Sequence, residues 1–433
     1  MDITSFRATI HACWTRLLLI AVACICPSAI AHAEITALIA GAVVDPVAET
    51  VTSNQTILIE GGKITAIDRD LPIPADANRI DLSKLMVIPG LIDAHTHLLA
   101  AIDPKWDLGD VWIMTLQRRA GYRAIQGARN AKDVLEAGFT TVRDVGNSGA
   151  YLDMDLEKAI RFGVVPGPTI IPAGRIIAPF GGQFWDTPAD AKLLENPEYY
   201  FADSHDEMRK AVRENIYWGA KVIKIVVDGQ RYQYSADDIR FIVEEAGRAG
   251  VKVAAHVQTA QAAHAAIEAK VASIEHAWDI TDADLALARK NGVALVSTDF
   301  TVFQLMANGF EKPAAERLHA QRIARLRRAY RAGVTLVFGT DIMNGLKQPT
   351  RGVQALEYID SFVEAGVPAP VILRAMTSNA AALLGIDAAR GSLRAGMAAD
   401  LIAVPGNPLE NIQALKAAAF VMRNGVVYRH SEP

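Results

Sequence analysis

Cysteine is absent from residue 27 to the end of this 433-residue chain, and the three cysteines present are Cys13, Cys24 and Cys26. This excludes disulfide bonds and thiolate metal ligands from the bulk of the protein, so any metal site must use histidine and oxygen ligands. The chain also lacks a basic excess, since its formal net charge is −4 at pH 7, and we expect no nucleic-acid partner. With 51% hydrophobic and 21% charged residues and no evident internal repeat, the composition is that of a globular protein with a large core.

A membrane-spanning run is lacking too. The most apolar stretch near the N-terminus, residues 17–26, is half the ~20 residues that a transmembrane helix needs. Arg7 and Arg16 precede it, and Ala31-His32-Ala33 follows it with the small-x-small pattern of a cleavage site. We therefore expect residues 1–33 to be a secretory signal peptide and the mature protein to be periplasmic or secreted, with no stable membrane span after cleavage.

A lipoprotein signal is the alternative for the same leader. Val22-Ala23 precedes Cys24 as such a signal requires, although Ala21 is a poor match for the larger aliphatic residue expected there. Whether Cys24 carries a lipid therefore stays open at this point.

The segment PGLIDAHTHL, residues 89–98, ends an apolar run with two histidines, His95 and His97, one residue apart. In an extended strand, residues i and i+2 point the same way, so both imidazoles can aim at one point just past the strand's end. An open pair of this kind suits a divalent metal. Two solvated loop histidines are the alternative for this motif alone, and other residues must decide between the two interpretations.

Four further candidates lie at the ends of apolar runs. They are Lys224 in VIKIVV, His256 after VKVAA, His276 in SIEH and Asp341 after LVFGT. If these runs are parallel strands of one closed sheet, their carboxyl ends share a face, and residues far apart in sequence can bind the same metal. The alternatives are a buried histidine with a backbone partner, a lysine reaching solvent, and an aspartate that caps a helix.

Strand-like runs alternate with helical patterns from residue 86 to about 385. The eight runs are 86–92, 140–144, 169–173, 222–227, 251–255, 272–276, 293–298 and 335–339. Two hydroxyl N-caps followed by an acid, Ser235 with Asp238 and Thr281 with Asp284, predict the starts of two intervening helices. Eight βα units predict an α/β fold, a closed (β/α)8 TIM barrel.

The two flanks of this region have strand character instead. Residues 56–60, the Gly61-Gly62 turn and residues 63–67 predict a hairpin, and residues 400–404 and 419–422 predict strands before the Asn424-Gly425 turn. We expect both termini to build one small β-sandwich-like domain. The predicted boundaries are 1–33 for the signal peptide, 34–85 and 389–433 for the two parts of the β domain, and 86–388 for the metallohydrolase barrel.

The ordered set of motifs resembles the metal-dependent amidohydrolase superfamily, in the branch that holds imidazolonepropionase-like enzymes and secreted prolidase-like carboxypeptidases. The resemblance covers nearly the whole chain after residue 33. It rests on PGLIDAHTHL at 89–98, TTVRDVG at 140–146, GAKVIKI at 219–225, AAHV at 254–257, SIEHAW at 273–278, FGTD at 338–341, TSNAAALLGI at 377–386 and GSLRAGMAADLIAV at 391–404. It implies a barrel of the predicted kind with a terminal β domain.

The resemblance also implies a ligand set for two divalent ions. The implied ligands are His95, His97, Lys224, His256, His276 and Asp341. Lys224 would be carboxylated and its carbamate would bridge the ions, because an unmodified ammonium has no lone pair and would repel them. Zinc is the expected metal, since imidazole and carboxylate ligands suit it. A hydroxide that bridges the ions would attack the substrate, and Asp341, as the catalytic residue, would accept its proton and pass it to the leaving group.

Substrate contacts are less well defined by the sequence. Prolidase-like relatives carry a histidine after the Gly-Gly that follows strand 3 and a tyrosine after the strand-5 histidine, whereas this chain has Gln183 and Gln258. A neutral amide brings no positive charge to a substrate carboxylate, so that contact is weaker. The predicted substrate-binding residues are Gln183, Gln258, Arg231, Trp185 and Phe300, with Arg175 as a second cationic candidate. Aromatic loops that face the site would select a bulky apolar substrate; packing of these loops onto the barrel is the alternative.

We therefore expect an exported metal-dependent hydrolase that cleaves an amide C–N bond, other than a peptide bond, in a small-molecule partner. An Xaa-Pro-type dipeptidase or carboxypeptidase is the first alternative. An ester, lactone or phosphotriester hydrolase with the same metal chemistry is the second, and a catalytically inactive solute-binding protein on the same barrel is the third. The physiological substrate, the metal in vivo and the oligomeric state stay open, and a homo-oligomer is compatible with the sequence.

Overall fold

The computed structural model describes residues 35–146, 148–183, 191–195 and 197–431. The predicted signal peptide, its cleavage site and Cys24 lie outside these residues. Within the described ranges, no helix is both long enough and apolar enough to cross a membrane.

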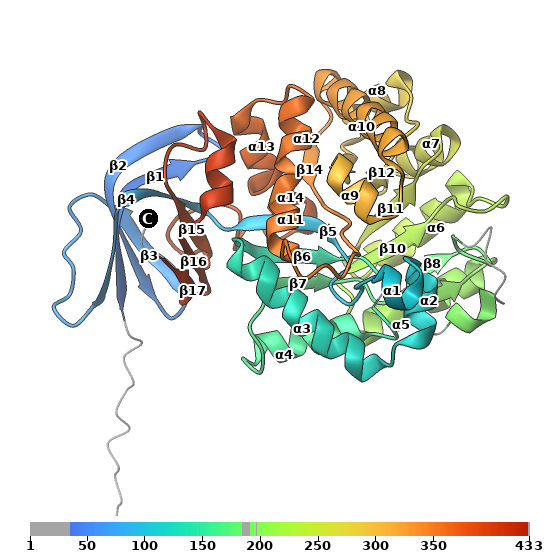
Figure 1. Ribbon diagram of the computed structural model, residues 1–433, viewed down its shortest axis with the longest axis horizontal. Coiled ribbons are helices and arrows are strands. Elements are labelled where there is room, and N and C mark those ends of the chain that lie inside the picture. Colours follow the sequence, from blue (N-terminus) through green and yellow to red (C-terminus); the bar gives the residue numbers. More distant parts are fainter. Residues whose placement is uncertain (1–34, 147, 184–190, 196, 432–433) are drawn as a thin grey trace, which may run out of the picture. The chain divides into compact units, whose positions relative to one another are not determined.

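Eight parallel strand positions form a barrel, which confirms the predicted (β/α)8 fold (Figure 1). The strands are β5 (Leu91–Thr96), β6 (Phe139–Asp144), β7 (Thr169–Pro172) with β8 (Ile176–Ala178) as one divided position, β10 (Val222–Val226), β11 (Lys252–Val257), β12 (Ser273–His276), β13 (Ala294–Ser297) and β14 (Leu336–Phe338). The ends of the first and last positions are joined by backbone hydrogen bonds, because Thr340 and Asp341 both donate to the carbonyl of His95, at 3.2 and 2.8 Å. A short strand, β9 (Tyr199–Phe201), pairs with β8.

Helices pack around these strands, and shorter ones lie in the connections (Figure 1). Their bounds are α1 (Pro104–Asp107), α2 (Val111–Gln117), α3 (Ala120–Glu136), α4 (Leu152–Arg161), η1 (Ala191–Leu194), α5 (His205–Trp218), α6 (Ala236–Gly247), α7 (Ala260–Glu268), α8 (Asp282–Asn291), α9 (Val302–Ala307), α10 (Lys312–Ala332), α11 (Arg351–Glu357), α12 (Ile359–Glu364), α13 (Ala369–Ala375), α14 (Ser378–Leu384) and η2 (Ile412–Ala417). The pair α1 and α2 after β5 was not predicted from the sequence.

Two of the helix starts follow from the hydroxyl caps that the sequence predicts. Ser235 and Asp238 form a reciprocal capping box at the start of α6, in which each side chain accepts from the other's backbone amide. Thr281 accepts from the backbone amide of Asp284 at the start of α8. Both predictions are confirmed.

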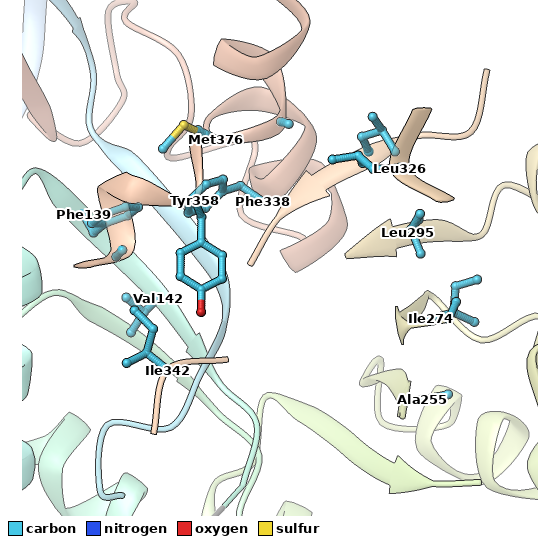
Figure 2. Close-up of a cluster of buried hydrophobic side chains, with 14 of the residues drawn as sticks. Phe139, Val142, Ala255, Ile274, Leu295, Leu326, Phe338, Ile342, Tyr358 and Met376 are labelled. Atoms are coloured by element: carbon cyan, nitrogen blue, oxygen red, sulfur yellow. The ribbon is translucent and has the colours of Figure 1, made fainter. Parts of the chain in front are cut away.

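The alternation of side chains along the strands separates the outer core from the barrel interior. Ile223 and Ile225 of β10 belong to the large hydrophobic cluster between strands and helices, so Lys224 between them points the other way. Figure 2 shows part of this cluster, with strand residues such as Ile274 and Leu295 and with Leu326 of α10. Burial of these faces orients the alternate, polar positions toward the interior.

Both ends of the described chain build one seven-stranded sheet in the order β17-β16-β15-β4-β1-β2-β3. Its strands are β1 (Thr36–Asp45), β2 (Thr50–Glu60), β3 (Lys63–Asp68), β4 (Asn78–Pro89), β15 (Leu401–Val404), β16 (Phe420–Arg423) and β17 (Val426–His430). The predicted hairpin is confirmed, since Glu60 pairs with Lys63 across the glycine turn. The sheet curls onto itself, because Ile64 donates to the carbonyl of Met397 at 2.9 Å. These features agree with the predicted terminal β domain.

The first predicted barrel strand, residues 86–92, is in fact two strands in two different sheets. β4 ends at Pro89 and β5 begins at Leu91, and Gly90 lies between them. A Cβ atom at position 90 would stand 2.2 Å from Oγ1 of Thr140, so the close passage beside β6 requires glycine. The apolar run continues through the break, which is why the sequence pattern alone does not reveal it.

Candidate active site

The six predicted ligand side chains line one cavity of about 200 Å³ at the carboxyl ends of the barrel strands. His95 lies in β5, with His97 just beyond it, Lys224 in β10, His256 in β11 and His276 at the end of β12. Asp341 follows β14 after two residues. This is the face on which (β/α)8 enzymes place their active sites. Within the described residues, ligand atoms of His95, His276 and Asp341 lie within 4.8 Å of one another.

The strand-1 pair is held in a defined orientation. Nδ1 of His95 lies 2.7 Å from Oε2 of Glu275, and Nδ1 of His97 lies 2.9 Å from the carbonyl of Gly146. Both partners accept, so each Nδ1 carries a proton and each Nε2 is the ring nitrogen left for another partner. Burial, followed by the charge of Lys224, keeps the pKa of His95 well below its usual value. This imidazole is therefore neutral, as a metal ligand must be.

A buried ion pair between Arg143 and Glu275 supports this orientation of His95. Glu275 accepts from Nη2 of Arg143 at 2.7 Å and from the hydroxyl of Ser273 at 2.5 Å. Arg143 in turn donates its Nε to the carbonyl of Ala94 at 2.5 Å. The carboxylate that orients His95 is thus itself fixed by charge-assisted hydrogen bonds from Arg143 on β6 and from Ser273 on its own strand, β12.

Lys224 is almost fully buried, with 2% of its surface exposed. Burial lowers its pKa to about 8, although the carboxylates of Glu275 and Asp341 act in the opposite direction. The amine is therefore deprotonated far more readily than a surface lysine. The neutral amine is the form that can add carbon dioxide and become a carbamate.

Asp341 and His276 both adopt a backbone conformation that side chains rarely take. Their φ angles are 57° and 69°, in the left-handed region. Such strain persists where surrounding structure holds it, and it is common at functional sites. Here the amide of Asp341 is held by the carbonyl of His95, and Nδ1 of His276 lies 2.7 Å from the hydroxyl of Thr298. The strained turns carry both side chains into the cavity.

The remaining histidine contacts the predicted substrate residue Gln183. The side-chain amide of Gln183 lies 3.2 Å from Nε2 of His256, and its oxygen accepts from the hydroxyl of Tyr199 at 2.8 Å. The tyrosine fixes the amide so that its NH2 group donates toward the cavity. Burial, followed by the charge of Lys224, keeps the pKa of His256 far below its usual value, so this ring is neutral as well.

The side-chain atoms of Asp341, His95 and His97 form a site that fits a cation. Oδ1 of Asp341 is buried and has no hydrogen bond among the described residues, yet it lies 3.0 Å from Nε2 of His97 and 3.6 Å from Nε2 of His95. The neutral ring of His95 keeps the lone pair of its Nε2, so this nitrogen and the carboxylate oxygen of Asp341 are two electron-rich atoms that face each other. A divalent ion resolves this arrangement, and imidazole with carboxylate suits zinc and similar metals.

The other predicted substrate residues do not line this cavity. Arg231 is exposed, and Gln258 uses its backbone amide to donate to Asp228 at 2.9 Å. Phe300 is buried against Arg322 and Tyr358, because its loop packs onto the barrel as the alternative interpretation expected. Trp185 lies outside the described residues. The sequence pattern shows that these residues follow strands but not which way their loops turn.

The second cationic candidate also lies elsewhere. Arg175 forms an ion pair with Glu214 of α5, and its guanidinium stacks over the rings of Tyr151 and Tyr200. It is thus part of the packing between the third strand position and the helices around it.

Four apolar residues complete the cavity wall, and the sequence analysis did not identify them. They are Val111, Trp112, Ile176 and Met343. Val111 and Trp112 begin α2, which lies in the long connection after β5, and the ring of Trp112 contacts that of Tyr199 at 5.7 Å. The length of that connection, in a fold whose connections are usually short, is the signal that would have pointed to them.

Comparison with known proteins gives a consistent result. The profile of the amidohydrolase family matches residues 86–428. The chain is 30% identical to an ochratoxinase from Aspergillus niger over an alignment of 435 positions, which covers 92% of this chain and 87% of the relative.

Solved structures agree with the sequence comparison. A Xaa-Pro dipeptidase with methionine bound in its active site is 30% identical, with a TM-score of 0.80 over 92% of this chain and 100% of that one. A prolidase in complex with N-methylphosphonate-L-proline is 27% identical, with the same TM-score and coverage.

Proposed function

Because the chain belongs to the amidohydrolase family and is a hydrolase that acts on carbon–nitrogen bonds, we propose that it is an exported binuclear metal enzyme that cleaves an amide bond of a small molecule. The observation that carries the proposal is the convergence of four histidines, Lys224 and Asp341 on one cavity. Nε2 of the neutral His95 faces the buried Oδ1 of Asp341, and a cation stabilises two electron-rich atoms that face each other.

Each side chain has a role in this proposal. His95 and His97 would hold one ion and His256 and His276 the other, and Lys224, as a carbamate, would be a further anionic ligand. Its lowered pKa favours that modification, because carbon dioxide adds to the neutral amine. The ions, when bound, polarise the scissile carbonyl and acidify water at the site.

Asp341 moves the proton. Its buried Oδ1 faces the histidine nitrogens and accepts the proton of the attacking water; the same carboxyl group then delivers it to the departing nitrogen. The backbone hydrogen bond to the carbonyl of His95 holds it in place at 2.8 Å. Acid–base assistance of this kind contributes roughly 10²- to 10⁴-fold.

An amide rather than a peptide substrate is favoured by Gln183. This amide faces the cavity beside His256 but carries no charge to pair with the carboxylate of a dipeptide. The structural neighbours include a prolidase and a Xaa-Pro dipeptidase, which keeps a dipeptidase as the second candidate. An ester, lactone or phosphotriester hydrolase shares the proposed metal chemistry.

A hydrolysis screen separates these candidates. The zinc-loaded protein is incubated with N-acyl amino acids, dipeptides, aryl amides and esters, and released amine or alcohol is quantified. We expect aryl amides, which need no carboxylate, to be cleaved faster than dipeptides. The His95→Ala protein serves as the blank, since cleavage that persists in it comes from a contaminant. Faster cleavage of dipeptides would overturn the preference, and cleavage of esters alone would overturn the assignment to amides.

A further inference from the structure

A second, larger cavity of about 760 Å³ lies beside the loop that follows β12 and the helix α10. Its wall includes the apolar side chains of Trp278, Ile280, Phe310 and Leu318, together with Arg322 and Arg325. Small-molecule pockets are typically about 300–1,000 Å³, so the cavity of about 200 Å³ at the histidines is small for a whole substrate, whereas this one is ample. A bulky substrate therefore needs the volume of a second cavity next to the atoms that react.

The two cavities are neighbours through Trp278, which lines the larger one and whose ring contacts that of His276 in the smaller one. Trp278 lies two residues after His276, and the two rings are 5.6 Å apart. The guanidinium of Arg322 stacks on two aromatic rings, 4.5 Å from the centre of the Trp278 ring and 4.9 Å from that of Phe300. Arg322 is thus one side chain away from a proposed metal ligand.

The second cavity collects hydrogen-bond donors that have no acceptor. Nη1 of Arg322, Nε and Nη1 of Arg325 and Nε1 of Trp278 are buried and have no hydrogen bond within the described part of the chain. Arg322 and Arg325 are 7% and 2% exposed. Buried donors cost free energy when they stay unpaired, and four such nitrogens around one cavity indicate a ligand that supplies acceptor atoms.

Charged groups of both signs surround the second cavity, and two of its guanidinium groups are buried. Among the described residues, Asp299 is the buried carboxylate paired with Arg325: its Oδ1 accepts from Nη2 of Arg325, while its Oδ2 has no hydrogen bond. Arg328, at the cavity rim, pairs with the exposed Asp282. Two buried guanidinium groups therefore share one buried carboxylate, while the exposed Asp279 lies on the cavity wall and the charge of Asp341 also acts on Arg322.

We propose that this cavity binds the carboxylate-bearing, apolar part of the substrate, with Arg322 as the residue that pairs with the carboxylate. The inference rests on the proposed amide hydrolase function and names its substrate class: amides whose one half is an apolar or aromatic acid. Trp278, Ile280 and Phe310 contact the apolar body, and the fork of Arg322 takes both oxygens. The amide bond then lies toward His276.

A purely structural role for Arg322 is the competing explanation. Its stacking on Trp278 and Phe300 stabilises the loop after β12, and cation–π contacts alone account for part of its burial. That role leaves Nη1 without an acceptor. It also predicts that a carboxylate and its neutral isostere bind equally, which the following measurement decides.

Phenylacetate and phenylacetamide are titrated calorimetrically into the metal-loaded wild-type protein, Arg322→Gln, Arg322→Lys and Arg331→Gln. We expect phenylacetate to bind the wild type more tightly than phenylacetamide, and Arg322→Gln to weaken only phenylacetate, by roughly 10- to 150-fold. Arg331 is exposed near the end of the same helix, so its variant removes the same charge and should change neither affinity. Arg322→Lys keeps the charge but loses the fork, and should bind phenylacetate with intermediate affinity.

The outcomes separate the subsite from the function. If the wild type and Arg322→Gln bind phenylacetate with equal affinity, the carboxylate binds at the metals alone and the subsite is overturned. The subsite is also overturned if the wild type binds phenylacetate and phenylacetamide equally. If Arg322→Gln does not fold, an Arg322→Lys protein with wild-type affinity for phenylacetate overturns it. Arg322-dependent binding with no amide hydrolysis in any assay supports the subsite and contradicts the proposed function. If the protein hydrolyses acidic amides and Arg322→Gln leaves their KM values unchanged, the proposed function is supported and the subsite is contradicted.

Discussion

Replacement of Lys224 by alanine is expected to remove one or both metal ions and nearly all hydrolytic activity. The side chain is 2% exposed and lines the same cavity as the four histidines. Without the carbamate, two cations would face each other with no bridging anion, and their repulsion would expel at least one. Metal content by elemental analysis and turnover on the best substrate of the screen measure the effect.

A chemical rescue and a matched control sharpen this test. Formate or propionate in excess should partly restore metal content and activity, because a small carboxylate can stand where the carbamate was. Lys221→Ala should do little, since Lys221 is exposed just before β10 begins. An essential Lys221 with a dispensable Lys224 would mean that the strand presents its other face to the cavity.

Replacement of Asp341 by asparagine is expected to lower turnover by roughly 10²- to 10⁴-fold while much of the metal remains bound. The amide keeps the shape of the carboxyl group but does not accept the proton from water at neutral pH. Its backbone, with φ at 57°, tolerates asparagine better than most residues, so the fold should be retained. Single-turnover kinetics and elemental analysis separate the loss of proton transfer from the loss of metal.

The His95→Ala protein is the comparison for this variant. This His95→Ala variant lacks the imidazole whose Nε2 faces Asp341 in the cavity. We expect the variant protein to lose metal outright. Near-normal turnover of Asp341→Asn would make another group responsible for the proton. An Asp341→Asn protein as poor in metal as His95→Ala would make Asp341 chiefly a ligand.

Much of this architecture follows from local sequence patterns. Alternation along the strands placed Lys224 and His256 on the interior face, because their neighbours Ile223 and Ala255 belong to the outer core. The pairing of parallel strands then brings their carboxyl ends together. The capping residues Ser235 and Thr281 predicted helix starts for an equally local reason.

Features that depend on tertiary packing were not accessible from the sequence. α10 contains many arginines, and its sequence does not distinguish the buried Arg322 from the exposed Arg331. Phe300 was expected at the site but turns into the core, since its loop closes over Arg322 and Tyr358. The break at Gly90 depends on the approach of Thr140 from another strand.

The metal content of the purified protein tests the central claim most directly. Two ions should share the cavity that His95, His97, Lys224, His256, His276 and Asp341 line. Elemental analysis of protein purified without chelator, together with activity measured as zinc is added back to stripped protein, gives the stoichiometry. We predict two ions per chain, with activity rising until both are bound. Full activity with one ion, or with none, would contradict the binuclear account.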